Sequence, residues 1–199
     1  MNESKSRNRI LKICVTAAMA AIVFVSNYLR ITMPIAVGGV TSFTLANILC
    51  ALSGILLGPG RGFLAAGLGS AIYDLTYPAY VMEAPITFFT KGMYGLIAGL
   101  VLHLIFVKAL KKQPESYIPQ VIATACAAIA YMVVYCVKNF FYNGMLIEGY
   151  TEAIQCWTVV IAKIPATLVN GALAVIFAPI LGVALRKALK SAKLDRILN

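Results

Sequence analysis

The sequence predicts an all-α integral membrane protein, a bundle of six transmembrane helices with both termini in the cytoplasm. Of its 199 residues, 61% are hydrophobic and only 12% are charged, about half the charged share of a soluble domain. Several apolar runs approach or exceed about 18 residues, the length typical of a membrane span. At about 20 residues per span, the chain has room for roughly six helices and short loops, and not for an ordinary soluble catalytic domain.

Apolar runs and turn residues define six expected spans within a single membrane domain, residues 1–199. The expected spans are 11–29, 43–57, 63–75, 85–107, 118–142 and 156–185. The sequence Gly-Pro-Gly-Arg-Gly at 58–62 predicts a turn after the second span, because glycine and proline favour tight turns. Pro85 suits the first turn of the fourth helix. Pro165 and Pro179 are expected to kink the sixth helix, because proline removes a helical hydrogen bond.

The distribution of basic residues predicts the orientation. Of the 17 Lys and Arg residues, 13 fall in four segments that six spans place on one side of the membrane. They are Lys5, Arg7, Arg9, Lys12, Arg61, Lys108, Lys111, Lys112, Arg186, Lys187, Lys190, Lys193 and Arg196. By the positive-inside rule, that side is the cytoplasm. The formal net charge of +10 therefore reflects membrane topology, and nucleic acid is not expected as a partner.

Polar side chains inside the expected spans indicate a binding site. An ionisable group in a span costs roughly 2.5–3.5 kcal/mol, so each is expected to face a partner or a cavity. Spacings of three, four and seven residues place such groups on one face of each of the last three helices. These faces carry Thr87, Lys91 and Tyr94; Tyr131, Tyr135, Lys138 and Tyr142, with Asn139 beside them; and Lys163, Thr167 and Asn170. With Asp74, they converge on the outer half of the bundle, which predicts a small-molecule site open to the exterior.

Two interpretations of the buried lysines stay open. The lysines could pair with Asp74 and Glu83 and only stabilise helix contacts. Alternatively, they could hold the anionic or hydrogen-bond-accepting edge of a ligand, while tyrosines or Trp157 stack on its ring. The chain has no Gly-x-x-x-x-Gly-Lys-[Ser/Thr] loop, a single histidine and no metal-type cysteine spacing, so no catalytic residue, metal site or cofactor is expected.

Residues 45–74 and 84–99 resemble the substrate-binding S components of energy-coupling factor (ECF) transporters, the bacterial and archaeal vitamin importers. The shared motifs are Leu-Gly-Pro, Gly-Ser-Ala-x-x-Asp and Lys-Gly-x-x-Gly-Leu-x-x-Gly, and the similarity covers most of the chain. These motifs are most like the subgroup assigned to hydroxymethylpyrimidine, a thiamine precursor, and to pyridoxine-type vitamins. No close match to the riboflavin or biotin subgroups is present.

The resemblance implies a binding subunit rather than an enzyme, and a multi-pass protein of a bacterial or archaeal cell membrane. The subunit would capture a vitamin from outside, under the first, third and fifth loops, and then dock on a transmembrane scaffold subunit and two ATPases. Ala17 and Ala21, an Ala-x-x-x-Ala pair in the first helix, would form the docking surface. The residues expected to bind the substrate are Asn47, Asp74, Glu83, Thr87, Lys91, Tyr94, Tyr135, Lys138, Asn139, Tyr142, Trp157, Lys163 and Asn170.

A stand-alone secondary transporter or channel for a small polar solute is the alternative function, with Lys91 and Asp74 as its gate. Copurification with ATPase subunits, together with tight binding by the isolated chain, would favour the importer subunit. An intramembrane enzyme is a third class, and the missing catalytic motifs argue against it.

The charge distribution gives a testable topology. A single cysteine introduced near Glu148, in a cysteine-free background, should react with an impermeant maleimide added outside the cell. A cysteine placed near Lys111 should react only after the cytoplasmic side is exposed. Labelling near Glu148 from the cytoplasmic side alone would overturn the orientation and remove the proposed outward-facing site.

Overall fold

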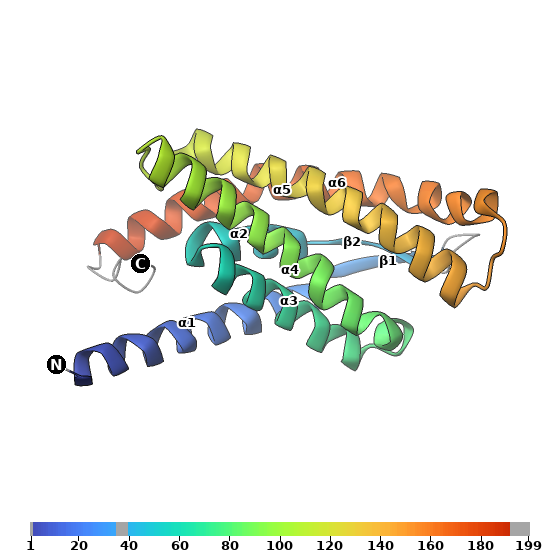
Figure 1. Ribbon diagram of the computed structural model, residues 1–199, viewed down its shortest axis with the longest axis horizontal. Helices are drawn as coiled ribbons and strands as arrows, with labels where there is room; N and C mark the ends of the chain where they lie inside the picture. The colour runs from blue at the N-terminus through green and yellow to red at the C-terminus, as the bar shows by residue number, and fades with distance from the viewer. Residues whose placement is uncertain (1, 35–39, 192–199) are drawn as a thin grey trace.

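The computed structural model describes residues 2–34 and 40–191 as an elongated helical bundle with one small β-hairpin (Figure 1). The elements are α1 (Asn2–Tyr28), β1 (Arg30–Pro34), β2 (Val40–Thr44), α2 (Ala46–Leu57), α3 (Pro59–Thr76), η1 (Pro78–Glu83), α4 (Ala84–Leu100), η2 (Val101–Ala109), α5 (Tyr117–Lys138), η3 (Asn139–Ile147) and α6 (Ala153–Ser191). η1 is a 3₁₀-helix, while η2 and η3 continue α4 and α5 as π-helices. Lys193 and Arg196, part of the predicted cytoplasmic end, lie outside the described residues.

Four helical segments of the described chain are long and apolar enough to cross a membrane. They are Ser6–Tyr28, Tyr80–Ala109, Tyr117–Ile147 and Ala153–Ser191. The last of these continues through Pro165 and Pro179 without ending. α2, with 12 residues, is only about 18 Å long, short of the roughly 30 Å hydrocarbon core. Of the six predicted transmembrane helices, four are thus supported by length and composition, and a crossing by α2 and α3 stays a prediction.

The two ends of the bundle carry different elements (Figure 1). The start of α1, the end of α6 and the connection between η2 and α5 lie at one end. The β-hairpin, η1 and the connection between η3 and α6 lie at the other, which we call the hairpin end. α2 runs away from the hairpin end and α3 returns to it, so this arrangement does not depend on whether the pair crosses the membrane. Which end faces the cytoplasm stays the prediction made from the charges.

The break between α2 and α3 is narrower than the sequence predicts. A turn is expected over residues 58–62, but α3 already begins at Pro59, and Gly58 alone separates the two helices. Gly58 has φ +81°, a backbone conformation that glycine adopts without a Cβ clash. Proline at the first helical position costs no hydrogen bond, because that N–H has no partner in the helix. The expected turn at 58–62 is therefore wrong for its last four residues, which form the first turn of α3.

The β-hairpin replaces the beginning of the predicted second span, 43–57. β1 and β2 pair antiparallel, with Arg30 opposite Thr44 and Thr32 opposite Ser42. In β2, every residue except Ser42 is β-branched or aromatic, and these residue types favour strands. The second helix consequently begins three residues later than expected, at Ala46.

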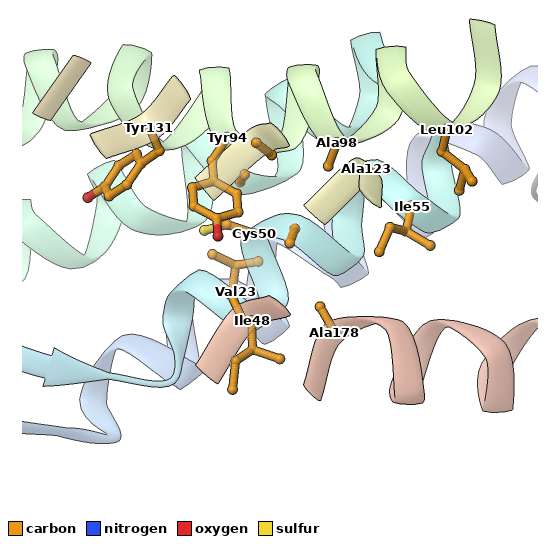
Figure 2. Packing of buried hydrophobic residues seen from close by; sticks show 14 residues of the cluster. Val23, Ile48, Cys50, Ile55, Tyr94, Ala98, Leu102, Ala123, Tyr131 and Ala178 are labelled. Atoms are coloured by element: carbon orange, nitrogen blue, oxygen red, sulfur yellow. The ribbon is translucent and has the colours of Figure 1, made fainter. Parts of the chain in front are cut away.

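Glycines allow the backbones of α2, α3 and α4 to touch. A Cβ added to Gly54 would lie 2.1 Å from the carbonyl oxygen of Gly95, and one added to Gly95 would lie 2.5 Å from that of Gly62. Such close approach is typical of small residues at helix contacts in membranes. Figure 2 shows the buried hydrophobic core, to which Val23, Ile48 and other residues of α1 to α6 and η2 contribute.

This packing gives a stability prediction. Gly95→Val should lower the thermal unfolding midpoint in detergent, because its side chain would overlap the backbone of α3, at a cost of about 1–3 kcal/mol. Gly171→Ala is the matched control, since its Cβ would meet only the Ala128 Cβ, at 3.7 Å. The control should leave the midpoint unchanged or raise it slightly, because alanine favours helices. An unchanged midpoint for Gly95→Val would contradict the close contact between α3 and α4.

Candidate functional site

A polar cavity lies at the hairpin end, and α1 to α6, η1 and the hairpin all contribute to its wall. The lining residues are Asn27, Arg30, Thr41, Ser42, Thr44, Asn47, Asp74, Tyr80, Glu83, Thr87, Thr90, Lys91, Tyr131, Tyr135, Lys138, Lys163, Ala166, Thr167 and Asn170. All of these except Ala166 carry a polar side-chain atom. The free volume is about 90 Å³, enough for several water molecules but below the roughly 300 Å³ at which ligand pockets usually begin. A bound vitamin would therefore require some of the lining side chains to move outward.

The hairpin is held against α6 by one amide side chain. Asn170 accepts a hydrogen bond from the Thr44 N–H at 2.8 Å and donates one to the Ser42 carbonyl, also at 2.8 Å. The hydroxyl groups of Ser42 and Tyr80 lie 3.2 Å apart, which links the hairpin to η1. These contacts make the hairpin one wall of the cavity, and they already satisfy both polar atoms of the Asn170 side chain.

Arg30, from β1, lies against the faces of aromatic rings. Its guanidinium carbon is 4.1 Å from the ring centroid of Tyr73 and 5.0 Å from that of Tyr80. Its Nε donates a hydrogen bond to the Asn27 carbonyl at 2.7 Å. Cation–π contacts of this kind are worth more when they are desolvated, so the rings stabilise a charge that has no ion-pair partner among the described residues.

Lys91, from α4, meets uncharged partners. Its ammonium donates a hydrogen bond to the side-chain oxygen of Asn47 on α2, and it lies 4.9 Å from the ring centroid of Tyr131. Tyr131 and Tyr135 stack on one another, with centroids 5.5 Å apart and an interplanar angle of 25°. The Tyr131 ring therefore contacts both the Lys91 ammonium and the ring of Tyr135.

Lys138 and Glu83 form the ion pair of the cavity. The Lys138 ammonium, on a side chain only 5% exposed, binds one carboxylate oxygen of Glu83. The other Glu83 oxygen accepts a hydrogen bond from the Asn143 amide at 3.0 Å. Tyr142 reinforces the same junction by donating to the Met82 carbonyl. Lys138 thus pairs with Glu83, as the first of the two interpretations of the buried lysines expects. The contacts of Glu83 join η1 to α5 and η3.

Lys163, from α6, is 4% exposed and lies in the cavity wall. Within residues 2–34 and 40–191, its ammonium makes no hydrogen bond or ion pair. Glu83 attracts it electrostatically, but both oxygens of that carboxylate are already bound. The second carboxylate of the wall, Asp74, is 6% exposed and lies near the side chain of Thr87.

Nine of the 13 predicted binding residues line this cavity. They are Asn47, Asp74, Glu83, Thr87, Lys91, Tyr135, Lys138, Lys163 and Asn170. The structure thus brings together polar groups from five helices and η1 that the sequence places on separate segments. Whether they bind a ligand stays a proposal.

Four predicted binding residues lie elsewhere. Tyr94 is fully buried behind Tyr131, with ring centroids 5.1 Å apart, and points from α4 towards α2 (Figure 2). Asn139 donates to the carbonyl of the residue four positions earlier, and Tyr142 bonds to η1. Trp157 is 53% exposed on α6 and makes an edge-type contact with the Phe140 ring, with centroids 5.4 Å apart.

Ten lining residues were not among the 13 predicted binding residues. They are Asn27, Arg30, Thr41, Ser42, Thr44, Tyr80, Thr90, Tyr131, Ala166 and Thr167. Tyr131 and Thr167 lie on the polar helix faces described from the sequence. Arg30 carried a further signal, because it is a basic residue outside the four segments that the positive-inside rule assigns to the cytoplasm. The hairpin residues gave no such signal, because a short polar strand resembles a loop.

The family model of the ECF-type riboflavin transporter, S component, matches residues 7–187, although the sequence motifs gave no close match to the riboflavin subgroup. The chain belongs to this family. It is therefore a multi-pass membrane protein and a substrate-binding transport subunit rather than an enzyme, and S components partner with scaffold and ATPase subunits. The solved S component of a bacterial ECF transporter has a similar fold, with a TM-score of 0.58 at 17% identity, over 92% of this chain and 96% of that chain. Among curated proteins, none matches this S component.

The buried ion pair gives a prediction with an internal control. Glu83→Gln should destabilise the S component by roughly 3–5 kcal/mol, because it leaves Lys138 charged and buried without a counter-charge. Glu115→Gln removes an ion pair with Lys190 whose lysine side chain is 58% exposed, and it should cost less than about 1 kcal/mol. Denaturant unfolding in detergent measures both. Equal destabilisation by the two variants would contradict a structural role for the buried pair.

Proposed function

We propose that this S component is the high-affinity substrate-binding subunit of an ATP-driven micronutrient importer in a bacterial or archaeal cell membrane. The observation that carries the proposal is the cavity at the hairpin end, whose wall is almost entirely polar within an otherwise apolar bundle. Convergent polar and aromatic groups in such surroundings are typical of small-molecule sites. Their cost in an apolar bundle is more readily explained by ligand binding than by helix packing alone.

The proposed ligand is a small planar heterocycle, a vitamin or precursor of the hydroxymethylpyrimidine or pyridoxine type. The stacked rings of Tyr131 and Tyr135 offer a surface for a planar ring, and Lys91 and Lys163 offer hydrogen-bond donors. A free volume of about 90 Å³ favours a one-ring ligand over a larger one. Riboflavin is the second candidate, because the matching family model is named for it.

The proposed coupling to transport runs through α1. Ala17 and Ala21 are one helical turn apart, both are exposed, and neither lines the cavity. Small exposed residues at this spacing allow another helix to approach closely. The alternative is that the two alanines pack inside the protein's own bundle, but both are exposed. We therefore propose that this strip docks on the scaffold subunit, which joins the S component to two ATPase subunits, with membrane lipid around the remaining apolar surface.

Binding and uptake, measured on the same variants, test the proposed function. Calorimetry with hydroxymethylpyrimidine, pyridoxine and riboflavin identifies the ligand for the purified S component. Ala17→Trp and Ala21→Trp should leave its affinity within about threefold, or roughly 0.7 kcal/mol, but should sharply lower uptake by cells that coexpress the partners. The reason is that tryptophan obstructs docking while the cavity lies at the hairpin end. Ala172→Trp, at an exposed alanine of α6, is the control and should alter neither quantity.

Two outcomes would contradict this function. Full uptake by both α1 variants would remove the docking role. Uptake by the chain without ATPase subunits would instead support the stand-alone transporter, with Lys91 and Asp74 as its gate.

A further inference from the structure

The charges on the wall of the cavity do not balance. Its described lining residues include four cations, Arg30, Lys91, Lys138 and Lys163, and two carboxylates, Asp74 and Glu83. Two positive charges are therefore in excess. Burying an ion away from water is costly unless an opposite charge and hydrogen bonds compensate it. The neutral ligands named above carry no negative charge, so they would leave this excess of positive charge uncompensated.

The available carboxylates cannot remove this excess. Both oxygens of Glu83 are bound, one by Lys138 and one by Asn143. Asp74 forms no ion pair with a described residue. One formal charge cannot neutralise the three remaining cations.

Two lysines are the cations with the weakest compensation. Lys91 has a neutral amide and an aromatic face as its partners, although an ammonium can donate three hydrogen bonds. Lys163, only 4% exposed, has no hydrogen bond or ion pair from its ammonium in the described part of the chain. Both side chains line the same small cavity as the stacked rings of Tyr131 and Tyr135.

We propose that the S component binds its ligand as an anion, a planar ring that carries a carboxylate or a phosphate group. The anionic group pairs with Lys163 and Lys91, and the ring lies against Tyr131 and Tyr135. Charge-assisted hydrogen bonds to an anion are about twice as strong as neutral ones, and they supply the counter-charge that the wall lacks. This inference rests on the proposed function and deepens it, because it names the charge of the substrate class.

Matched pairs of compounds that share a ring and differ in charge test the inference. The carboxylate arm compares nicotinate with nicotinamide and 4-pyridoxate with pyridoxine. The phosphate arm compares pyridoxine 5′-phosphate with pyridoxine, and riboflavin 5′-phosphate with riboflavin. Calorimetry on the purified S component should show at least tenfold tighter binding of the anionic member in one arm. The arm that shows the preference identifies the anionic group.

Variants separate charge recognition from folding. Lys163→Met should lower the affinity for the preferred anion at least tenfold. It should change the affinity for the neutral compound of the same pair less than threefold. Lys163→Arg keeps the charge and should recover most of the preference. Lys190→Met, at a lysine 58% exposed on its side chain, is the control and should change neither affinity. The melting temperature of each variant, measured in parallel, reports on its folding.

The inference is overturned if the neutral member of every pair binds as tightly as the anion, or if no compound of either arm binds. It is also overturned if Lys163→Met, with an unchanged melting temperature, weakens both members of a pair equally. Tight binding and uptake of a neutral vitamin would overturn the inference that the ligand is an anion, but would leave the proposed function intact. Loss of uptake dependence on the ATPase subunits would remove the proposed function without affecting the charge preference.

Discussion

A cation inside an apolar helical bundle needs a partner, and this requirement organises the hairpin end of the S component. Each of its pairings crosses between elements. Lys138 on α5 meets Glu83 on η1, Lys91 on α4 meets Asn47 on α2, and Arg30 on β1 lies over rings of α3 and η1. Because the cost of an unpaired charge is several kcal/mol, these contacts determine how the elements at this end lie against one another.

The polar contacts depend in turn on close helix packing. α2 is too short to span a bilayer by itself, and yet its first turn must place Asn47 within reach of Lys91. The close approach of the Gly54 and Gly95 backbones brings α2 directly against α4. Larger side chains at these glycines would separate the helices, and the cavity would lose its polar wall on that side.

Helical periodicity predicts part of this site because it is a local property. Thr87 and Lys91 are four residues apart, so they share a face whatever the helix packs against, and both line the cavity. Periodicity does not give depth or absolute rotation. Tyr94 shares that face but lies about 4.5 Å further along the axis than Lys91, behind Tyr131. Trp157 precedes Lys163 by six residues, which rotates it about 240° around α6, away from the cavity and towards the outer surface.

The hairpin could not be predicted in the same way. Its contacts are non-local, since Asn170 of α6 satisfies backbone groups of Ser42 and Thr44 more than a hundred residues earlier. Fold class and family could be predicted because they depend on local properties of the sequence. These properties are the hydrophobic spans and the short motifs in α2 to α4. The transmembrane count does not, because α2 and α3 combine apolar composition with lengths that do not decide between crossing and dipping into the bilayer.

The central claim, that the cavity is a ligand site, is tested most directly by mass spectrometry of small molecules released from the purified S component. We predict that one heterocyclic compound accompanies the wild-type protein in near-equimolar amount and is strongly depleted in a folded Lys163→Met variant. Absence of any such compound from the wild-type protein, after purification from cells grown with a full vitamin supplement, would contradict the claim. An equal amount of the compound in both proteins would contradict a role of Lys163 in binding it.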